Sequence, residues 1–207
     1  AKAEATVRDA VWSLSRNSAG MCVRFVTSSP AIRTRWTLTS DSLAMPHMPA
    51  TGVSGLDLYV RHDQDRTWRF VQNARPSSQF TNTATFRTGQ ASGPREFLVY
   101  LPLYNGVTRL ELGVETGIEL APIVEKDPPA ARPVVIYGTS IVQGGCASRP
   151  GLAYPAILGR RLGVPVINLG FSGSGRMEAA VADLLAELDP AAFVIDCLWN
   201  CGGMPDG

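Results

Sequence analysis

The sequence has 207 residues, with 19 basic and 18 acidic side chains and a formal net charge of +1. This balance creates no field that would hold a polyanion or a charged bilayer surface, so it argues against nucleic acid and membranes as partners. No stretch reaches the roughly twenty apolar residues that cross a bilayer, and the first residues lack the apolar segment of a secretion signal. A segment removed during maturation would leave no trace, so the compartment stays open, with the cytoplasm favoured.

Residues 23–120 show alternating apolar and polar side chains, the pattern of strands with one buried face. In the stretch 32–39, IRTRWTLT, the even-numbered residues share one face and the odd-numbered residues the other. Gly, Pro, Asn and Ser clusters separate similar stretches that begin at Leu56, Trp68, Arg95 and Thr108. Strands at this spacing predict an antiparallel, jelly-roll-like β-sandwich domain over residues 1–125.

A proline-rich connector at residues 121–133, APIVEKDPPAARP, precedes a different pattern. Continuous apolar segments, typical of strands buried on both faces of a parallel sheet, occupy 134–137, 164–168 and 192–197. Between them, apolar residues recur at helical spacing: Tyr154, Ile157, Leu158 and Leu162, then Met177, Val181, Leu184, Leu185 and Leu188. This order predicts the first part of an α/β/α domain with a parallel sheet over residues 132–207.

Ser140 lies in a glycine-flanked turn, YGTSIVQGG, directly after the first of these segments, and Gly173 and Asn200 each follow one of the other two. Because parallel strands end at one edge of a sheet, we expect the three residues to converge there. A serine hydroxyl at a helix start can attack an acyl carbonyl, and the resulting oxyanion needs fixed donors. The amides of Ser140 and Gly173 and the side chain of Asn200 can supply them. A side chain at position 173 would block the approach to its amide.

Other interpretations of the glycine-rich turn fit less well. It lacks the lysine of a phosphate-binding loop and the later glycines of a dinucleotide fingerprint. Val142 stands where the common α/β hydrolases have a glycine after the nucleophile. The four cysteines, Cys22, Cys146, Cys197 and Cys201, lack the close paired spacing of a zinc site. We therefore expect neither a metal nor another cofactor.

The serine turn and the segment before Gly173 resemble two blocks of the SGNH hydrolases, also called the GDSL esterase and lipase family. GTSIVQGG is similar to the first block, with Ser140 as the nucleophile and Thr139 where the family more often has aspartate. NLGFSG, residues 168–173, resembles the second block, whose last glycine, here Gly173, belongs to the oxyanion hole.

Two further segments extend the resemblance. DCLWN, residues 196–200, is similar to the third block, whose asparagine, here Asn200, completes the oxyanion hole; Leu198 stands where a glycine is usual. MPHMPATGVSGLDLY, residues 45–59, resembles a segment of the amino-terminal domain in one branch of the family, with acyl and carbohydrate esterases among its members.

The resemblance implies an esterase that removes short acyl groups from a small-molecule ester, with a sugar as a candidate alcohol, through an acyl-serine intermediate. Transfer of the acyl group to a hydroxyl other than water is one alternative. A carbohydrate-binding sandwich attached to a noncatalytic remnant is another, in which the binding aromatics would be Trp36, Tyr59, Trp68 and Tyr104.

The family also has an Asp-x-x-His near its carboxyl end, which this sequence lacks. We therefore expect a fragment that is nearly inert alone and whose open sheet edge promotes self-association. Of the two histidines, His47 lies in a loop that could reach the mouth of the site, and His62 is expected to be solvated. Arg149 and Arg176 follow the first two blocks and are candidates to contact an acyl or sugar oxygen.

Overall fold

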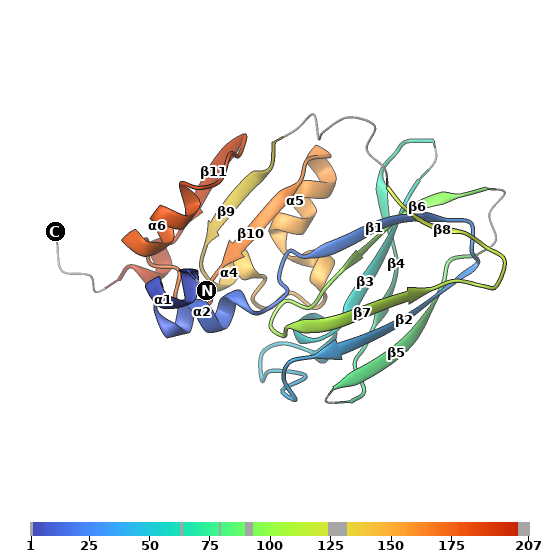
Figure 1. The fold of residues 1–207 in the computed structure, drawn as a ribbon, viewed down its shortest axis with the longest axis horizontal. Helices are drawn as coiled ribbons and strands as arrows, with labels where there is room; N and C mark the ends of the chain where they lie inside the picture. The colour runs from blue at the N-terminus through green and yellow to red at the C-terminus, as the bar shows by residue number, and fades with distance from the viewer. Residues whose placement is uncertain (1, 63, 79, 90–92, 124–131, 203–207) are drawn as a thin grey trace.

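The computed structural model describes residues 2–62, 64–78, 80–89, 93–123 and 132–202. Two β-sheets form a sandwich and a third, parallel sheet carries helices on both faces (Figure 1). The sandwich strands are β1 (Cys22–Thr27), β2 (Ala31–Leu38), β3 (Leu56–Arg61), β4 (Trp68–Ala74), β5 (Thr81–Arg87), β6 (Arg95–Tyr100), β7 (Val107–Gly113) and β8 (Leu120–Pro122), with the short helix α3 (Ala50–Val53) before β3. The expected antiparallel sandwich is confirmed.

The sandwich pairs a five-stranded sheet, in the order β4-β3-β6-β1-β8, with a three-stranded sheet, in the order β5-β2-β7. Strand β2 buries alternate residues, as its sequence predicts, and it is the central strand of the smaller sheet. The core between the sheets contains large apolar side chains from both, among them Trp36, Phe86 and Phe97, each fully buried. This burial supplies the main stabilisation of the sandwich.

The five-stranded sheet is covered on its second face as well, which differs from the half-buried strand expected at residues 56–61. Leu56 and Leu58 of β3 pack in the sandwich core, while Asp57 and Tyr59 point the other way and are also buried. Tyr59 lies in a cluster with Tyr100 of β6 and Ala156 of a helix in the second half of the chain. An aspartate is typical of a solvent-facing position, and here the segment Arg149–Gly151 covers it.

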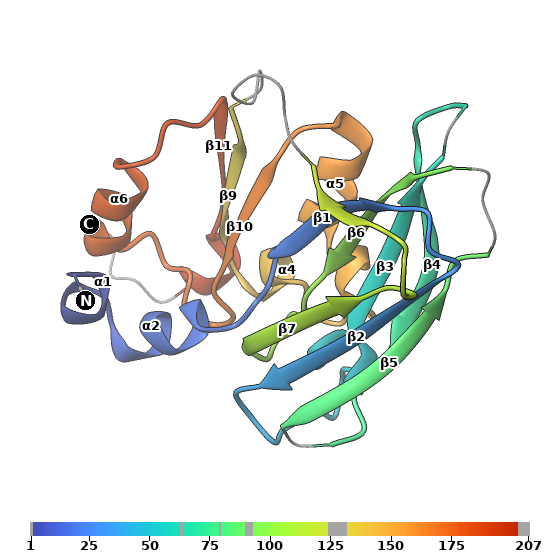
Figure 2. The ribbon, with the colours of Figure 1, turned by 45° about the vertical axis from the view of Figure 1, so that its right-hand side comes forward.

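The second half contains β9 (Val134–Gly138), β10 (Val166–Gly170) and β11 (Ala192–Asp196), parallel in the order β10-β9-β11. Its helices are α4 (Ser140–Gln143), α5 (Tyr154–Leu162) and α6 (Ala179–Leu185), with short 3-10 turns η1 (Pro150–Leu152) and η2 (Leu198–Asn200). Helices α4 and α5 lie between this sheet and the sandwich, and α6 lies on the opposite face (Figures 1 and 2). The predicted parallel sheet with helices is therefore confirmed.

Helix α6 is shorter than its apolar spacing predicts. It ends at Leu185, before Leu188, and begins after Met177, whose φ of 59° is incompatible with a helix. The segment before it instead follows the loop that carries Gly173.

Two short helices that the sequence analysis did not anticipate, α1 (Lys2–Thr6) and α2 (Asp9–Ser15), precede the sandwich strands. Val11 of α2 is buried against Tyr137 of β9 and Val181 of α6. Helix α2 thus packs on the parallel sheet, although the sequence between this helix and that sheet forms the sandwich. Much of the predicted proline-rich connector, residues 124–131, lies outside the described residues.

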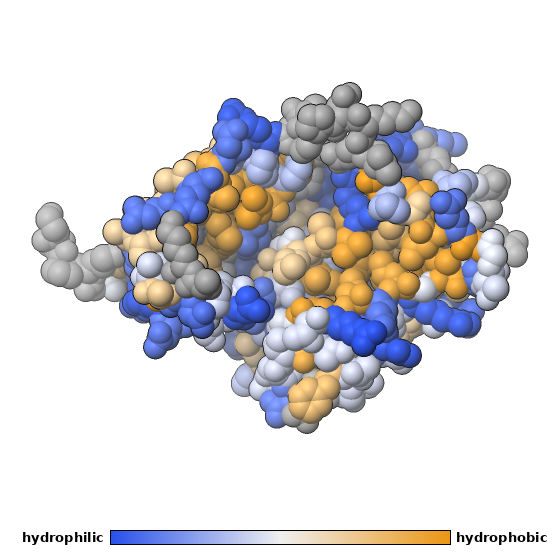
Figure 3. Space-filling model, viewed as in Figure 1, coloured by the Kyte–Doolittle hydropathy of each residue, from blue (hydrophilic) through white to orange (hydrophobic). Residues whose placement is uncertain are grey.

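Strand β11 is more exposed than the other two parallel strands. It occupies an edge of the sheet, and Phe193 and Ile195 are 45% and 58% exposed. Hydrophobic residues gather over the parallel sheet in the space-filling view (Figure 3). Within the described residues, no helix is both long enough and apolar enough to cross a bilayer.

The two halves of the chain meet around a buried ion pair. Arg149 Nη1 lies 2.9 Å from Asp57 Oδ2 and donates to the Tyr59 hydroxyl at 2.7 Å. Its guanidinium also stacks 3.7 Å from the centre of the Phe70 ring. Asp57 is fully buried and accepts two more hydrogen bonds, from the Gly151 amide at 2.8 Å and from Asn73 Nδ2 at 2.9 Å. One carboxylate of β3 therefore holds two groups of the segment that follows α4.

We expect Arg149→Met to lower the free energy of unfolding by about 3 kcal/mol, because it leaves the buried carboxylate of Asp57 without its counter-charge. Chemical denaturation measures this loss. The matched control, Arg109→Met, breaks an exposed ion pair with Glu111 and should change stability little. Equal denaturation midpoints for the two variants would contradict the prediction.

Candidate active site

The ends of the three parallel strands are aligned around Gly138. This residue pairs with Gly170 of β10 on one side and with Asp196 of β11 on the other. Ser140, Gly173 and Asn200 follow these three positions by two, three and four residues, respectively. The structure therefore places all three predicted residues beyond the same edge of the sheet.

Ser140 is the first residue of α4, and Thr139 caps that helix. The Thr139 hydroxyl accepts a hydrogen bond from the Ile141 amide at 3.3 Å, and the Thr139 amide donates to the Asp196 carbonyl at 3.2 Å. Capping of this kind satisfies an amide that the helix itself cannot pair. Threonine thus performs here the capping for which serine, aspartate and asparagine are also suited.

A left-handed glycine ends helix α4 after one turn. Gly144 has a φ of 114°, and its amide and that of Gly145 donate to the Ser140 carbonyl at 3.0 and 2.7 Å. The Tyr104 hydroxyl, from the sandwich half, donates to the same carbonyl at 3.3 Å. Among the described residues, the Ser140 hydroxyl itself has no hydrogen-bond partner, so it is available for chemistry.

The loop that carries Gly173 is fixed by its own amides. The amides of residues 170, 171, 172, 174, 175, 176 and 177 all have acceptors within the protein. In the described part of the chain, the Gly173 amide has none. Gly173 has a φ of 67°, and a Cβ added there would meet no atom within 4 Å. The backbone is therefore left-handed at this point, and the space where a Cβ would stand is open.

Tyr137 of the central strand supports the far end of this loop. Its hydroxyl accepts the amides of Arg176 and Met177 at 3.1 and 3.2 Å. Burial raises the pKa of Tyr137, so the hydroxyl stays protonated at neutral pH. The Arg176 side chain folds back, and its Nε donates to the Gly173 carbonyl at 3.1 Å. This role of Tyr137 could not be predicted, because an apolar strand segment carries no sign that its tyrosine binds a distant loop.

Asn200 ends the short turn η2, and its side chain has an unpaired donor. Its Nδ2 atom is buried and lacks a hydrogen-bond partner in the described residues. A buried donor without an acceptor costs about 1–3 kcal/mol and needs an explanation. The neighbours Leu198 and Trp199 are 83% and 81% exposed, so η2 is held mainly through Cys197, which is buried.

The side chain of Asp196, which lies just before η2, has a hydrogen-bond partner of its own. The Tyr154 hydroxyl lies 3.5 Å from Asp196 Oδ2. Burial and the nearby negative charge of Asp196 raise the pKa of Tyr154 to about 12, so the hydroxyl remains a donor. The carboxylate next to the serine turn is thus bound by a neutral group rather than by a cation.

Three N–H donors are therefore unpartnered among the described residues at this edge: the amides of Ser140 and Gly173 and the Asn200 side chain. Fixed donors around a free hydroxyl can stabilise the oxyanion of an acyl transfer. The free hydroxyl and the fixed donors are the two elements of the site that the sequence predicts.

The other predicted residues lie elsewhere. Arg149 is engaged by Asp57 and Tyr59 at the junction of the two halves. His62 follows β3, and its Nδ1 lies 3.1 Å from Asp65 Oδ1. His47 is exposed at a tight turn closed by reciprocal backbone hydrogen bonds between Met45 and Met48. Within the described residues, neither histidine forms a hydrogen bond or ion pair with Ser140.

The loop of His47 nevertheless lies on the segment that follows α4. Met48 is buried in a cluster with Ala153, and the Thr51 hydroxyl donates to the Ser148 carbonyl at 2.6 Å. A hollow of about 530 Å³ is lined by residues 44–51 and Arg75. The loop therefore contacts the second half of the chain at Ser148 and Ala153, and its reach to the mouth of the site stays a prediction.

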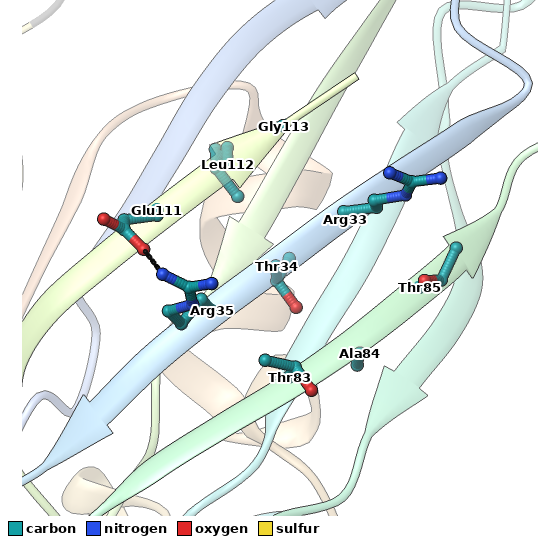
Figure 4. A pocket seen from close by; sticks show the side chains of 9 residues that line it. All are labelled: Arg33, Thr34, Arg35, Thr83, Ala84, Thr85, Glu111, Leu112 and Gly113. Atoms are coloured by element: carbon teal, nitrogen blue, oxygen red, sulfur yellow. Dashed lines mark ion pairs between the residues drawn. The ribbon is translucent and has the colours of Figure 1, made fainter. Parts of the chain in front are cut away.

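A second hollow, of about 570 Å³, lies on the three-stranded sheet of the sandwich (Figure 4). It contains none of the predicted site residues, and Arg35 in it pairs with Glu111 at 3.3 Å. Of the aromatics considered for carbohydrate binding, Trp36 and Tyr59 are buried, so neither can stack on a sugar. The lining residues are Arg33, Thr34, Arg35, Thr83, Ala84, Thr85, Glu111, Leu112 and Gly113.

A free serine hydroxyl after the central strand of a parallel sheet, beside unpartnered N–H donors, is the arrangement of a serine hydrolase or acyl-transfer enzyme. Residues 1–120 match the GxDLY family, described as the N-terminus of Esterase_SGNH_hydro-type. Residues 131–205 match the GDSL-like Lipase/Acylhydrolase family. The chain belongs to the SGNH, or GDSL-like, hydrolase family, and the resemblance stated from its sequence is confirmed.

Solved structures agree with this assignment. A Bacteroides ovatus protein described as a GDSL-like lipase is 38% identical, with a TM-score of 0.85 over 95% of this chain and 56% of its own. The salicylyl-acyltransferase SsfX3 of a tetracycline biosynthetic pathway is 20% identical, with a TM-score of 0.70 over 93% and 51% of the two chains. A family two carbohydrate esterase of Clostridium thermocellum, in complex with cellohexaose, is 13% identical, with a TM-score of 0.58 over 91% and 62%.

The last two structures share the fold with this chain. The chain spans between about half and three-fifths of the length of the three structures. No curated protein matches the sequence.

Two glycines, three positions apart, should respond differently to alanine. A Cβ at Gly170 would overlap the backbone of Gln143, so Gly170→Ala should force α4 away from β10 and cost about 3 kcal/mol or more. Gly173→Ala meets open space and should cost about 1–2 kcal/mol, the strain of its positive φ. Urea unfolding compares the two, and a larger loss for Gly173→Ala would disprove the close contact.

Proposed function

We propose that this chain carries the nucleophile and the oxyanion hole of a serine esterase that hydrolyses short acyl esters. The observation that carries the proposal is the group of three unpartnered donors, from Ser140, Gly173 and Asn200, at the edge where the Ser140 hydroxyl is also free. The unpaired Nδ2 of Asn200 is one of these donors, and an oxyanion that reached it would supply the missing acceptor.

In the proposed reaction, the Ser140 oxygen attacks the ester carbonyl carbon and its proton passes to a general base. The carbonyl oxygen becomes an oxyanion that accepts hydrogen bonds from the three donors. Collapse of this intermediate expels the protonated alcohol and leaves an acyl-serine. Water then attacks the acyl carbon by the same route, which releases the acid and restores the hydroxyl. The chain's own groups thus bind the charge that develops on oxygen, and no metal enters these steps.

The substrate class is proposed from chemistry and fold together. The open space beside Gly173 admits a carbonyl group, and Arg176, exposed and held at the Gly173 carbonyl, is placed to contact an acyl or sugar oxygen. We propose a small ester, with a carbohydrate as the alcohol, in line with the fold shared with a carbohydrate esterase. Arg149 is a weaker candidate for this contact, because Asp57 and Tyr59 occupy its guanidinium.

Acyl transfer is the second candidate function, favoured by the fold shared with the salicylyl-acyltransferase over most of this chain. The same nucleophile and donors serve either outcome, since only the attacking hydroxyl differs. Product analysis with competing alcohols distinguishes them, because a transferase converts the ester to a new ester and a hydrolase converts it to an acid.

The proposed function is tested by acylation of the 207-residue chain with p-nitrophenyl acetate, with imidazole added as the base. Without the base of a triad, such a site retains about 10³–10⁴-fold enhancement over water. We expect one acetyl group on Ser140, located by peptide mass spectrometry. Asn200→Ala should lower the acylation rate about 100-fold, because it removes one oxyanion donor.

Ser148→Ala is the matched control, since Ser148 is exposed and its hydroxyl forms no hydrogen bond within the described residues. It should acylate at the wild-type rate, whereas Ser140→Ala should not acquire the acetyl group. Equal acetylation of Ser140→Ala and the wild-type chain would refute the nucleophile assignment.

A further inference from the structure

Gln143 is a fully buried polar residue in the nucleophile helix, and both ends of its amide are hydrogen bonded. Its Oε1 accepts the Ser172 amide at 2.9 Å. Its Nε2 donates to the Leu103 carbonyl at 3.1 Å. The two partners lie 29 and 40 residues away in the sequence, so one side chain connects three segments of the fold.

The first of these bonds acts on the oxyanion loop. Ser172 precedes Gly173, whose amide is the unpartnered donor, and Gln143 lies one turn after Ser140 in α4. The backbones also meet directly, because Gly170 has no room for a Cβ beside Gln143. Gln143 therefore sets the position of the Gly173 amide relative to the helix that carries the nucleophile.

The second bond connects this pair to the sandwich half. Leu103 is buried in a cluster with Met48, Val53 and Ala153. The next residue, Tyr104, donates its hydroxyl to the Ser140 carbonyl at 3.3 Å. The segment after β6 thus holds both ends of the nucleophile helix, one through Gln143 and one through Tyr104.

We infer that Gln143 is a positioning residue for the oxyanion hole, and that the segment Leu103–Tyr104 of the sandwich half is the support on which it rests. This inference depends on the proposed function, since it assigns the position of a donor in that same site. Gln143 touches no reacting atom. Its effect is to hold the Gly173 amide where the oxyanion forms.

The experiment replaces the buried amide by an apolar side chain of similar size, Gln143→Leu, in the 207-residue chain. Asn82→Leu is the matched control, because Asn82 is also buried and also accepts backbone amides, those of Ser77 and Ser78, within the sandwich. Both variants leave buried backbone groups without partners. The free energies of unfolding of the two variants should therefore fall by similar amounts, but only Gln143→Leu should affect the site.

Two readouts separate positioning from general destabilisation. Hydrogen exchange followed by NMR should show a protected Ser172 amide in the wild-type chain and in Asn82→Leu, and an unprotected one in Gln143→Leu. Acetylation by p-nitrophenyl acetate with imidazole should slow about 100-fold in Gln143→Leu, the scale of a misplaced catalytic group, with an unchanged half-saturating ester concentration. Wild-type acetylation kinetics in Gln143→Leu would overturn the inference.

If Gln143→Leu does not fold, Gln143→Asn takes its place, since its shorter side chain cannot span both partners. An exposed Ser172 amide with slowed acetylation would support the inference, and an exposed amide with unchanged acetylation would overturn it. Failure of the wild-type chain to acetylate Ser140 counts against the proposed function. The exchange readout then still decides whether Gln143 fixes the loop, so the two failures are distinguishable.

Discussion

The structure depends on the close approach of three chain segments to the backbone of Gly138. The Phe171 amide donates to the Gly138 carbonyl at 2.8 Å, and the amide of the next residue, Thr139, donates to the Asp196 carbonyl at 3.2 Å. A Cβ at position 138 would overlap the Asp196 carbonyl, and one at Gly175 would overlap the Gly138 carbonyl. Glycine is required on both sides because backbone meets backbone there. This contact brings the loops after the three strands to one place.

The sandwich is the scaffold that supports α4 and the segment after it. Its GLDLY segment, residues 55–59, places Asp57 and Tyr59 on the face turned toward α5, where they bind the segment that follows α4. The segment after β6 supports the helix itself, through Leu103 and Tyr104. Two contact regions on the sandwich therefore fix α4 and the segment that follows it. A buried carboxylate at such a junction specifies one geometry, because an unpaired charge would be strongly destabilising.

The sequence predicts where the parallel strands lie and which residues follow them, because continuous apolar segments are typical of such strands. It predicts burial on both faces for β11 as well, and this is wrong, because β11 is an edge strand whose residues 192–195 are exposed. The sequence also predicts β2, from the alternation of its apolar and polar residues. It fails for β3, where Asp57 reads as solvent-facing although α5 and its neighbours cover it, and for α1 and α2, which are too short for a clear helical period. The role of Gln143 could not be predicted, since its partners are distant in sequence and a glutamine beside two glycines is typical of an exposed turn.

Thr139 has a consequence for the formation of an alkoxide at the neighbouring residue. Many members of the family carry a carboxylate at this position, and a buried anion there would oppose ionisation of the serine by Coulomb repulsion. Here the buried capping residue, Thr139, is uncharged. The carboxylate of Asp196, the residue paired with Gly138, has the Tyr154 hydroxyl as its neighbour. Less electrostatic work is therefore needed to place negative charge on the Ser140 oxygen than with an aspartate at position 139. The backbone dipoles of the turn also meet no competing anion from the capping residue.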